Sequence, residues 1–403
     1  MGFRRPSNPQ ATTLDLRAQR LGESQHNLNP TLERPTQQLV AQCPHMHVGL
    51  AIYGDLEQTS GGYRYDRKLV SHLEARGDTV TVISLPRESD PDRPLEGVRD
   101  RLDQPYDVLI QDELCYPDLT AVNPHLERPG LIVALVHLLE APHPGTTASD
   151  DSRRTVDYER RYLESVDAAI ATSEYTRSKT ADLAAMPTAV VHPAGRREGA
   201  ALEAELVRTR AREKPFRVAF VGNLLPRKNL PALLRALADV DAAWELTVVG
   251  GETDPAEAGR ARTHATDLEI ADSVEFAGQV DTDTLESILE RAHVLAVPAS
   301  YEGFGMVYLE AMEFGVAPIA SAVGGASDIV EDGENGYLVD PDDPTAIAEC
   351  LDGLVADRKR LASLGCRALE TANTHPTWTE SMEAFRETLQ TWLADSSVGP
   401  RDE

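Results

Sequence analysis

Short apolar runs alternate with helical segments along most of this chain, and this alternation limits the fold more than any other feature. In the N-terminal half, the runs lie at residues 47–53, 79–85, 107–110, 131–137 and 167–172. A helix is predicted at 63–76, because Leu69, Val70 and Leu73 share one face and Gly77 follows the segment. Strands that alternate with helices predict a parallel sheet with helices on both faces.

The same alternation returns in the C-terminal half of the chain. The pattern weakens near Pro193, and a charged helical stretch at 199–213 is a candidate connector between two domains. A helix is expected from about Asn229, and further apolar runs lie at 217–221, 246–249, 273–276, 293–298 and 316–320. The sequence therefore predicts an α/β protein with two doubly wound, Rossmann-like units.

The two ends of the chain differ from its middle. The first 45 residues are polar and aperiodic, so they are either disordered or absent from a native chain that begins at Met46. We expect a disordered extension at 1–45, an N-terminal domain at 46–200, a C-terminal domain at 201–375, a helix at 376–394 and a loose tail at 395–403. The helix at 376–394 is expected to return to the N-terminal domain.

The charge balance restricts the partners of this protein. The chain has 39 Lys and Arg against 66 Asp and Glu, a formal net charge of −27. Such a charge repels nucleic acid and anionic lipid, so neither is expected as a general partner. The balance fits an ordinary acidic cytoplasmic protein or adaptation to high salt, where screening removes the self-repulsion, and we favour the second.

Missing motifs exclude several classes of protein. No apolar run of about 18 residues and no apolar signal core occur, so we expect neither a membrane-spanning helix nor a cleaved secretion signal. The four cysteines form no C-x-x-C pair, which indicates free thiols in the cytoplasm. The signatures of dehydrogenases, P-loop NTPases, α/β-hydrolases and zinc proteases are also missing. The protein is expected in the cytoplasm, either free or held at the inner face of the membrane by a small local patch.

The segment 297–312 carries the strongest chemical signal. An apolar strand leads into a loop that contains Glu302, Gly303 and Gly305, and a helix that contains Glu310 follows. Ligands in open α/β sheets bind at the carboxyl ends of strands, where glycines let backbone N–H groups approach them. Carboxylates accept strong hydrogen bonds from sugar hydroxyls. Either glutamate taken alone could instead be an exposed surface residue.

A second segment, 222–229, suits a diphosphate. Gly222 and Asn223 follow a predicted strand, and Arg227 and Lys228 precede a predicted helix. A basic pair in such a place is often only a feature of the surface. Lysine is nearly absent from this chain, however, with five in all, so a lysine at a strand–helix junction favours a function.

These segments resemble the E-x7-E signature and its neighbours in retaining glycosyltransferases of the GT-B fold, especially family 4. The resemblance runs from about Met46 to the C-terminal helix and also includes 218–229, 274–280, 324–325 and 332–339. It implies two Rossmann-like domains that face a central cleft. It also implies that Glu302 holds the donor sugar, Glu310 the ribose and Lys228 the phosphates, with Phe304 in the donor loop. Many relatives have Gly-Arg at Gly222-Asn223, so one expected cation is missing, and whether Arg227 replaces it stays open.

Three features of the chain have two readings each. The pair Gly61 and Gly62 is either a flexible turn or the loop that the family places near the diphosphate and the acceptor. His137 ends a predicted strand, where it is either structural or, as we favour from the family, close to the donor sugar. The pair at 324–325 either supports the donor loop or only turns the chain.

The resemblance implies a retaining hexosyltransferase that uses a UDP- or GDP-sugar and a hydroxyl acceptor on a glycan, a lipid or a small molecule. No cofactor and no metal are expected. The alternatives are a nucleotide-sugar epimerase or a sugar phosphorylase of the same fold, or a non-catalytic binding module. The expected catalytic residues are Glu302, Lys228 and His137, and the expected donor-binding residues are Gly222, Asn223, Arg227, Gly303, Phe304, Gly305 and Glu310.

Overall fold

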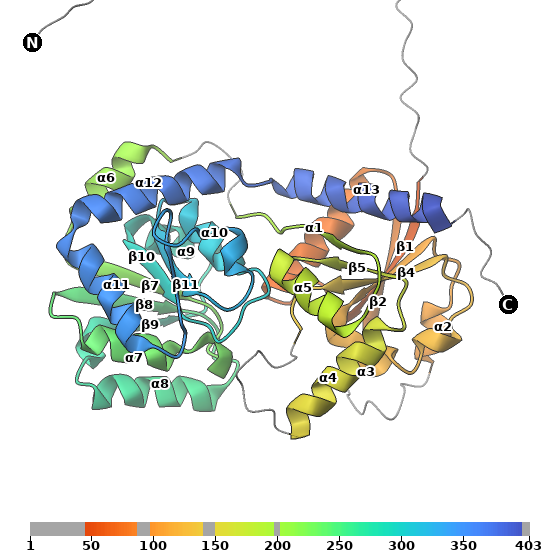
Figure 1. Ribbon diagram of the computed structural model, residues 1–403, viewed down its shortest axis with the longest axis horizontal. Coiled ribbons are helices and arrows are strands. Elements are labelled where there is room, and N and C mark those ends of the chain that lie inside the picture. Colours follow the sequence, from red (N-terminus) through yellow and green to blue (C-terminus); the bar gives the residue numbers. More distant parts are fainter. Residues whose placement is uncertain (1–44, 87–96, 140–149, 197–201, 397–403) are drawn as a thin grey trace, which may run out of the picture. The chain divides into compact units, whose positions relative to one another are not determined.

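The computed structural model describes residues 45–86, 97–139, 150–196 and 202–396. These residues form two parallel sheets of six strands each, with helices packed around both sheets (Figure 1). The predicted extension lies outside the described residues except for His45, and so do residues 397–403 of the predicted tail. Among the described residues, no helix has both the length and the apolar composition needed to cross a membrane.

The first sheet has the strand order β2-β1-β3-β4-β5-β6. Its strands are β1 (His47–Tyr53), β2 (Thr79–Leu85), β3 (Val108–Asp112), β4 (Leu131–Val136), β5 (Ala168–Ala171) and β6 (Thr188–Val190). The helices of this region are α1 (Gly61–Ala75), α2 (Val98–Leu102), α3 (Tyr116–Leu119), α4 (Asp150–Leu163) and α5 (Glu174–Leu183). Strands β3, β4 and β5 are buried along their whole length, as expected for a sheet covered on both faces.

The second sheet has the strand order β12-β11-β10-β7-β8-β9. Its strands are β7 (Phe216–Val221), β8 (Trp244–Val249), β9 (Val274–Gly278), β10 (Val294–Val297), β11 (Ala317–Ser321) and β12 (Tyr337–Val339). The helices of this region are α6 (Ala204–Arg210), α7 (Leu230–Ala238), α8 (Pro255–Asp267), α9 (Thr282–Arg291), α10 (Met306–Met312), α11 (Pro344–Ala356) and α12 (Arg358–Thr374).

Each sheet reverses its strand order at one point. The chain runs outward from β1 to β2 and then crosses to β3, and it runs outward from β7 to β9 and then crosses to β10. Loops on the two sides of such a reversal diverge, and they leave room for a ligand at the carboxyl ends of the strands. The predicted strands of both halves are confirmed, whereas the short edge strands β6 and β12 were not predicted.

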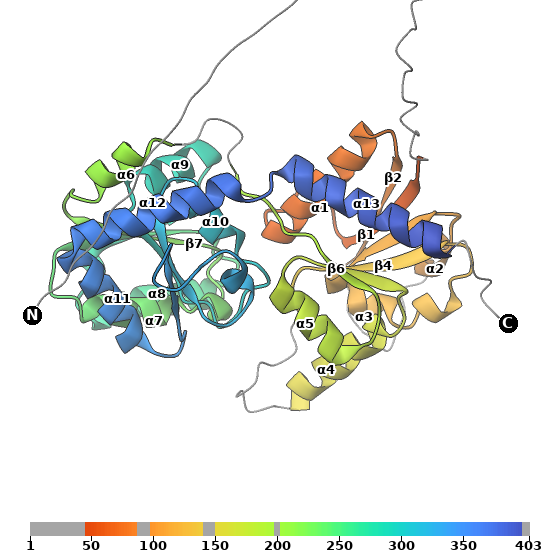
Figure 2. The ribbon, with the colours of Figure 1, turned by 45° about the horizontal axis from the view of Figure 1, so that its top comes forward.

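The last helix, α13 (Trp378–Ser396), belongs to the packing of the first sheet and not of the second (Figures 1 and 2). Trp378 and Phe385 lie beside Tyr65 of α1, with ring centroids 5.8 and 6.2 Å apart. Arg386 donates two hydrogen bonds of 2.7 and 3.0 Å to the buried carboxylate of Asp78. A paired guanidinium and carboxylate of this geometry fixes the helix in one register.

Candidate functional site

Glu302 lies in the loop between β10 and α10, and its side chain is buried with 8% exposure. Lys228 Nζ donates a hydrogen bond to Glu302 Oε1, and Arg227 Nη1 lies 3.3 Å from the same oxygen. Both cations belong to a single 3₁₀ turn after β7, Pro226–Lys228. The backbone N–H of Ser300 donates to the carbonyl of Arg227 over 2.7 Å, which holds the two loops together. The reversal point of the second sheet therefore brings together one carboxylate and two cations.

The charges in this group stabilise one another. Burial raises the pKa of Glu302, but the charges of Lys228 and Arg227 outweigh burial, so the pKa lies below its ordinary value. Burial lowers the pKa of Lys228, and Glu302 opposes that change. With all three groups ionised, the cluster has one positive charge in excess, which suits an anionic ligand.

Gly222 and Asn223 shape the neighbouring loop and contribute no charge to it. A Cβ atom at Gly222 would lie 3.2 Å from Lys228 Cε, so glycine leaves room for the lysine stem. The side-chain oxygen of Asn223 accepts a hydrogen bond of 3.2 Å from the backbone of Gly251, which joins the loops after β7 and β8. The second cation beside Glu302, in addition to Lys228, is Arg227, while residue 223 has a structural partner.

The donor loop continues through Gly303, Phe304 and Gly305 into α10. A Cβ atom at Gly303 would lie only 1.9 Å from the carbonyl oxygen of His137, so no other residue fits there without a shift. The hydroxyl of Ser173 donates to the Gly303 carbonyl over 2.5 Å. Phe304 is buried, and Gly305 immediately precedes the helix. Elements of the first sheet therefore touch the loop that carries Glu302.

The glycine pair at 324–325 supports this loop from its other side. A Cβ atom at Gly324 would lie 2.4 Å from the carbonyl oxygen of Glu302, and one at Gly325 would lie 2.0 Å from that of Gly303. The backbone N–H of Gly325 also donates to the Glu302 carbonyl over 2.9 Å. Of the two readings of this pair, the structure favours support of the donor loop.

Glu310 lies inside α10 and is buried with 4% exposure. Arg64 of α1 donates a hydrogen bond to it, and Arg196 Nη2 lies 3.3 and 3.5 Å from its two oxygens. A ligand hydroxyl at Glu310 would compete with these arginines. Neither arginine was predicted from the sequence, because Arg64 and Glu310 are separated by 246 positions and no motif connects them.

His137 and the glycine pair at 61–62 are neighbours. His137 follows β4, and a Cβ atom at Gly62 would lie 3.3 Å from its Cδ2 atom. A Cβ atom at Gly61 would lie 3.3 Å from the sulfur of Met306, the first residue of α10. Gly61 and Gly62 are the first two residues of α1 and form neither a flexible turn nor a loop, so the start of this helix lies against both His137 and the start of the helix that carries Glu310.

A buried acidic group surrounds His137. One ligand atom each of Asp66, Asp112 and His137 lie within 4.8 Å of one another, and Glu113 adjoins them. Burial raises the pKa of Asp112 to about 6 and that of Glu113 well above its usual value. No such group was predicted from the sequence, because Asp66 lies within α1, Asp112 ends β3 and His137 follows β4, and these residues meet only in the folded protein.

This group could hold either a cation or a proton, since its ligand atoms lie within 4.8 Å of one another and Nε2 of His137 is 3.3 Å from Oδ1 of Asp66. A histidine must be neutral to bind a metal. Burial lowers the pKa of His137, but the hydrogen bond and charge of Asp66, with Glu113 and Asp112, raise it to about 10.

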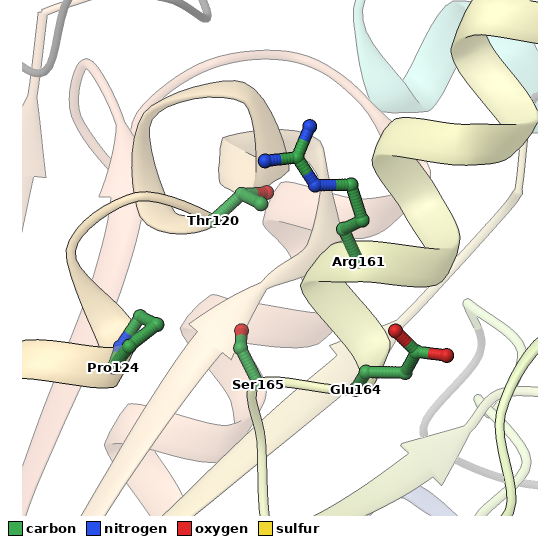
Figure 3. Close-up of a pocket in the computed structure, with 5 residues that line it drawn as sticks. All are labelled: Thr120, Pro124, Arg161, Glu164 and Ser165. Atoms are coloured by element: carbon green, nitrogen blue, oxygen red, sulfur yellow. The ribbon is translucent and has the colours of Figure 1, made fainter.

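A shallow hollow open to solvent lies elsewhere in the first region, between α3 and α4 (Figure 3). None of the predicted site residues lines it. Figure 3 shows the Arg161 side chain extending toward Thr120, whereas the Glu164 carboxylate points away from Thr120 and Pro124. The residues that line the hollow are Thr120, Pro124, Arg161, Glu164 and Ser165.

Comparison with known sequences finds similarity over the C-terminal half of the chain. Residues 203–371 match the family model of glycosyl transferases group 1. The D-inositol 3-phosphate glycosyltransferase of Salinispora tropica is 40% identical over 164 residues, which are 38% of this chain and 33% of that protein. The enzyme of the same name from Nocardia farcinica is 33% identical over 186 residues, 44% of this chain and 40% of that protein. The chain thus aligns with less than half of the length of these relatives.

Comparison with solved structures covers both sheets. Sucrose-phosphate synthase from Thermosynechococcus elongatus superimposes with a TM-score of 0.71 at 23% identity, over 87% of this chain and all of that chain. Anabaena HepE in complex with UDP-glucose superimposes with a TM-score of 0.66 at 18% identity, over 86% of this chain and all of that chain. The fold is therefore the two-domain α/β fold of GT-B glycosyltransferases, as the resemblance implied.

Proposed function

We propose that this protein is a retaining glycosyltransferase that moves a hexose from a nucleotide-diphosphate sugar to a hydroxyl group of an acceptor. The observation that carries the proposal is the buried contact of Glu302 with Lys228 and Arg227 at the reversal point of the second sheet. The match of residues 203–371 to glycosyl transferases group 1 covers this group and supports the proposal.

The chemistry follows from the charges of the donor site. Breaking the bond between sugar and diphosphate leaves negative charge on the diphosphate, and Lys228 and Arg227 supply fixed positive charge at that place. Glu302 would hold sugar hydroxyls near the carbon where positive charge develops. The acceptor hydroxyl attacks from the face that the diphosphate leaves, and the departing phosphate takes the proton. In this scheme no protein nucleophile and no metal ion take part.

A UDP-sugar is our first choice of donor, with a GDP-sugar as the second. HepE, whose structure resembles this one, is described in complexes with UDP and with UDP-glucose. Glu310 is the proposed ribose ligand, which requires Arg64 and Arg196 to release at least part of its carboxylate. The acceptor is a glycan, a lipid or a small molecule, and we place the reaction in the cytoplasm, free or at the inner face of the membrane.

Two other functions would use the same fold. A sugar phosphorylase would need a lysine for pyridoxal phosphate, and the chain has only five lysines, one of which contacts Glu302. A nucleotide-sugar epimerase would invert one carbon of the sugar of the same donor without an acceptor, and its product would again be a nucleotide sugar. A non-catalytic binding module would have no need of a buried group of one carboxylate and two cations at Glu302.

A panel of nucleotide sugars tests the proposal. The full-length protein is incubated with UDP- and GDP-hexoses, with and without a mixture of hydroxyl acceptors, and the release of nucleotide is followed. We expect release that depends on one nucleobase and that rises with acceptor. Inversion of a sugar carbon without net release of nucleotide would indicate an epimerase, and binding with neither inversion nor release would indicate a binding module.

A further inference from the structure

The side chain and backbone of His137 are held from several directions. Its ring nitrogen Nε2 lies 3.3 Å from Asp66 Oδ1, and the ring of Tyr65 meets it edge-on at 5.4 Å. The carboxylate of Glu113 accepts hydrogen bonds from the backbone N–H groups of His137 and Leu138, over 2.9 and 3.0 Å. Both the position and the orientation of the imidazole are therefore fixed before any ligand binds.

The described groups that act on the charge of His137 are all acidic. They are Asp66 on α1, Asp112 at the end of β3 and Glu113 immediately after it. The second oxygen of Asp66 is buried and has no hydrogen-bond partner among the described residues. A carboxylate so placed needs a nearby positive charge, and a protonated His137 supplies one.

One ring nitrogen of His137 is left for another partner. Nδ1 makes no hydrogen bond within the described part of the chain, and the side chain is 12% exposed. The carbonyl of the same residue touches Gly303, next to Glu302 in the donor loop. A protonated imidazole has an N–H on each nitrogen, so Nδ1–H can donate to a ligand held by that loop.

We propose that Asp66 is a positioning residue: it binds His137 at Nε2 and keeps the ring a cation whose Nδ1–H donates to the nucleotide sugar beside the Glu302 loop. This rests on the proposed function for the identity of the ligand. The contact by which Asp66 keeps the proton on His137 does not depend on the proposed function. Asp66 itself does not touch the sugar and acts only through the imidazole.

The variant Asp66→Asn tests the proposal, because it keeps the shape of the side chain and removes its charge. We expect His137 to lose its proton at a lower pH than in the wild type, and the titration of its imidazole signal in NMR measures this pH. The signal is assigned by its loss in His137→Gln. This measurement needs no substrate, so it tests the Asp66 contact even if the donor has been identified wrongly.

Activity gives the second readout. In Asp66→Asn we expect turnover to fall roughly tenfold to a hundredfold, the range for one lost charged hydrogen bond. The alkaline limb of the turnover profile should move toward neutral pH, while the KM for the donor changes less. Asp66→Glu should restore part of the turnover, since it returns the charge.

Asp118→Asn is the matched control. Asp118 is a buried carboxylate of the same region, and it accepts a hydrogen bond of 2.5 Å from Tyr53 with no contact to His137. It should leave the titration of His137 and the pH profile unchanged, whatever its effect on stability. If it moves both as far as Asp66→Asn does, general destabilisation is the cause and the proposal fails.

Two other results would also overturn the proposal. One is an unchanged titration of His137 in folded Asp66→Asn. The other is one equivalent of zinc retained by the wild type and lost in Asp66→Asn, which would make the group a metal site with a neutral histidine. A shifted titration with an unchanged pH profile would overturn the part of the proposal in which His137 serves the sugar donor.

Discussion

Two buried ionic clusters, one on each sheet, have opposite charge. In the cluster of the second sheet, Lys228 and Arg227 surround the carboxylate of Glu302. In the cluster of the first sheet, the described acidic groups surround the single imidazole of His137. The cluster of the second sheet has positive charge in excess, and the cluster of the first sheet has negative charge in excess.

The comparison shows that local charge, and not the net charge of the chain, decides what each site can hold. The chain as a whole has a formal charge of −27, which repels anions at long range. The cluster at Glu302 nevertheless offers an anion two cations at short range. The cluster at His137 binds its own proton and presents a cation only through the imidazole. We therefore expect loss of a charge to have different consequences in the two places.

The largest effect is expected for Lys228→Ala. This substitution removes one cation from the diphosphate site and leaves Glu302 with Arg227 alone. We expect turnover to fall roughly a hundredfold to a thousandfold, as for loss of one donor to a developing negative charge, and free nucleoside diphosphate to bind more weakly. Steady-state rates and calorimetry measure the two effects.

Lys359→Ala is the control for that experiment, because Lys359 is an exposed lysine at the start of α12. It should retain the rate and nucleotide affinity of the wild type. If Lys228→Ala also retains the rate and the nucleotide affinity of the wild type, then the excess positive charge at Glu302 has no part in binding. The difference in charge between the two clusters would then have no consequence for function.

The two glutamates of the second region should separate binding from turnover. Glu302→Gln is expected to lower turnover about tenfold to a hundredfold while free nucleotide binds almost normally. The reason is that Glu302 is expected to bind sugar hydroxyls near the reacting carbon and not the nucleotide. Glu310→Gln should weaken the nucleotide itself by a similar factor, with or without a sugar attached. Calorimetry with both ligands gives the pattern, and the reverse pattern would contradict the assignment.

The pH dependence of stability should differ in sign between the clusters. Burial lowers the pKa of His137, but Asp66, Glu113 and Asp112 raise it to about 10. The contribution of His137 to the stability of the fold is therefore complete below about pH 6.5 and is lost as the pH rises through 10. Burial raises the pKa of Glu302, but Lys228 and Arg227 lower it below its ordinary value. The contribution of Glu302 to the stability of the fold is therefore present above about pH 4.5 and is lost as the pH falls through the pKa of the folded protein.

Urea unfolding between pH 7 and 9.5 tests the first of these signs. A difference of one bound proton between the folded and unfolded states changes the free energy of unfolding by at most about 1.4 kcal/mol per pH unit. We expect the wild type to lose stability over this range and His137→Gln to lose less of it. Parallel curves for the two proteins would show that His137 is not the group that holds the proton.

The smallest effect is expected for salt. The 66 acidic residues repel one another in the compact state, so screening should raise the melting temperature from low salt to molar potassium chloride. The buried clusters are screened much less than the surface, so the variants of either cluster should show the same salt increment as the wild type. A melting temperature that is equal or higher at low salt would argue against adaptation to high salt.

Much of the fold could be predicted from the sequence, because strand and helix signals are local. The run at 79–85 became β2 and the run at 47–53 became β1 without a change of limits. The edge strands β6 and β12 were missed because they have three residues each, too few to show a pattern. The exact limits of the two domains stay a prediction.

The sequence by itself indicated that Glu302 and Lys228 follow strands of one sheet, because each lies in the segment between an apolar run and the next predicted helix. Only the tertiary structure decided that these two residues share a hydrogen bond, that Arg64 reaches Glu310 and that Asp66 holds His137. The physical reason is the strand order of each sheet. Pairing between strands joins residues far apart in the chain, and no local pattern records which strands become neighbours.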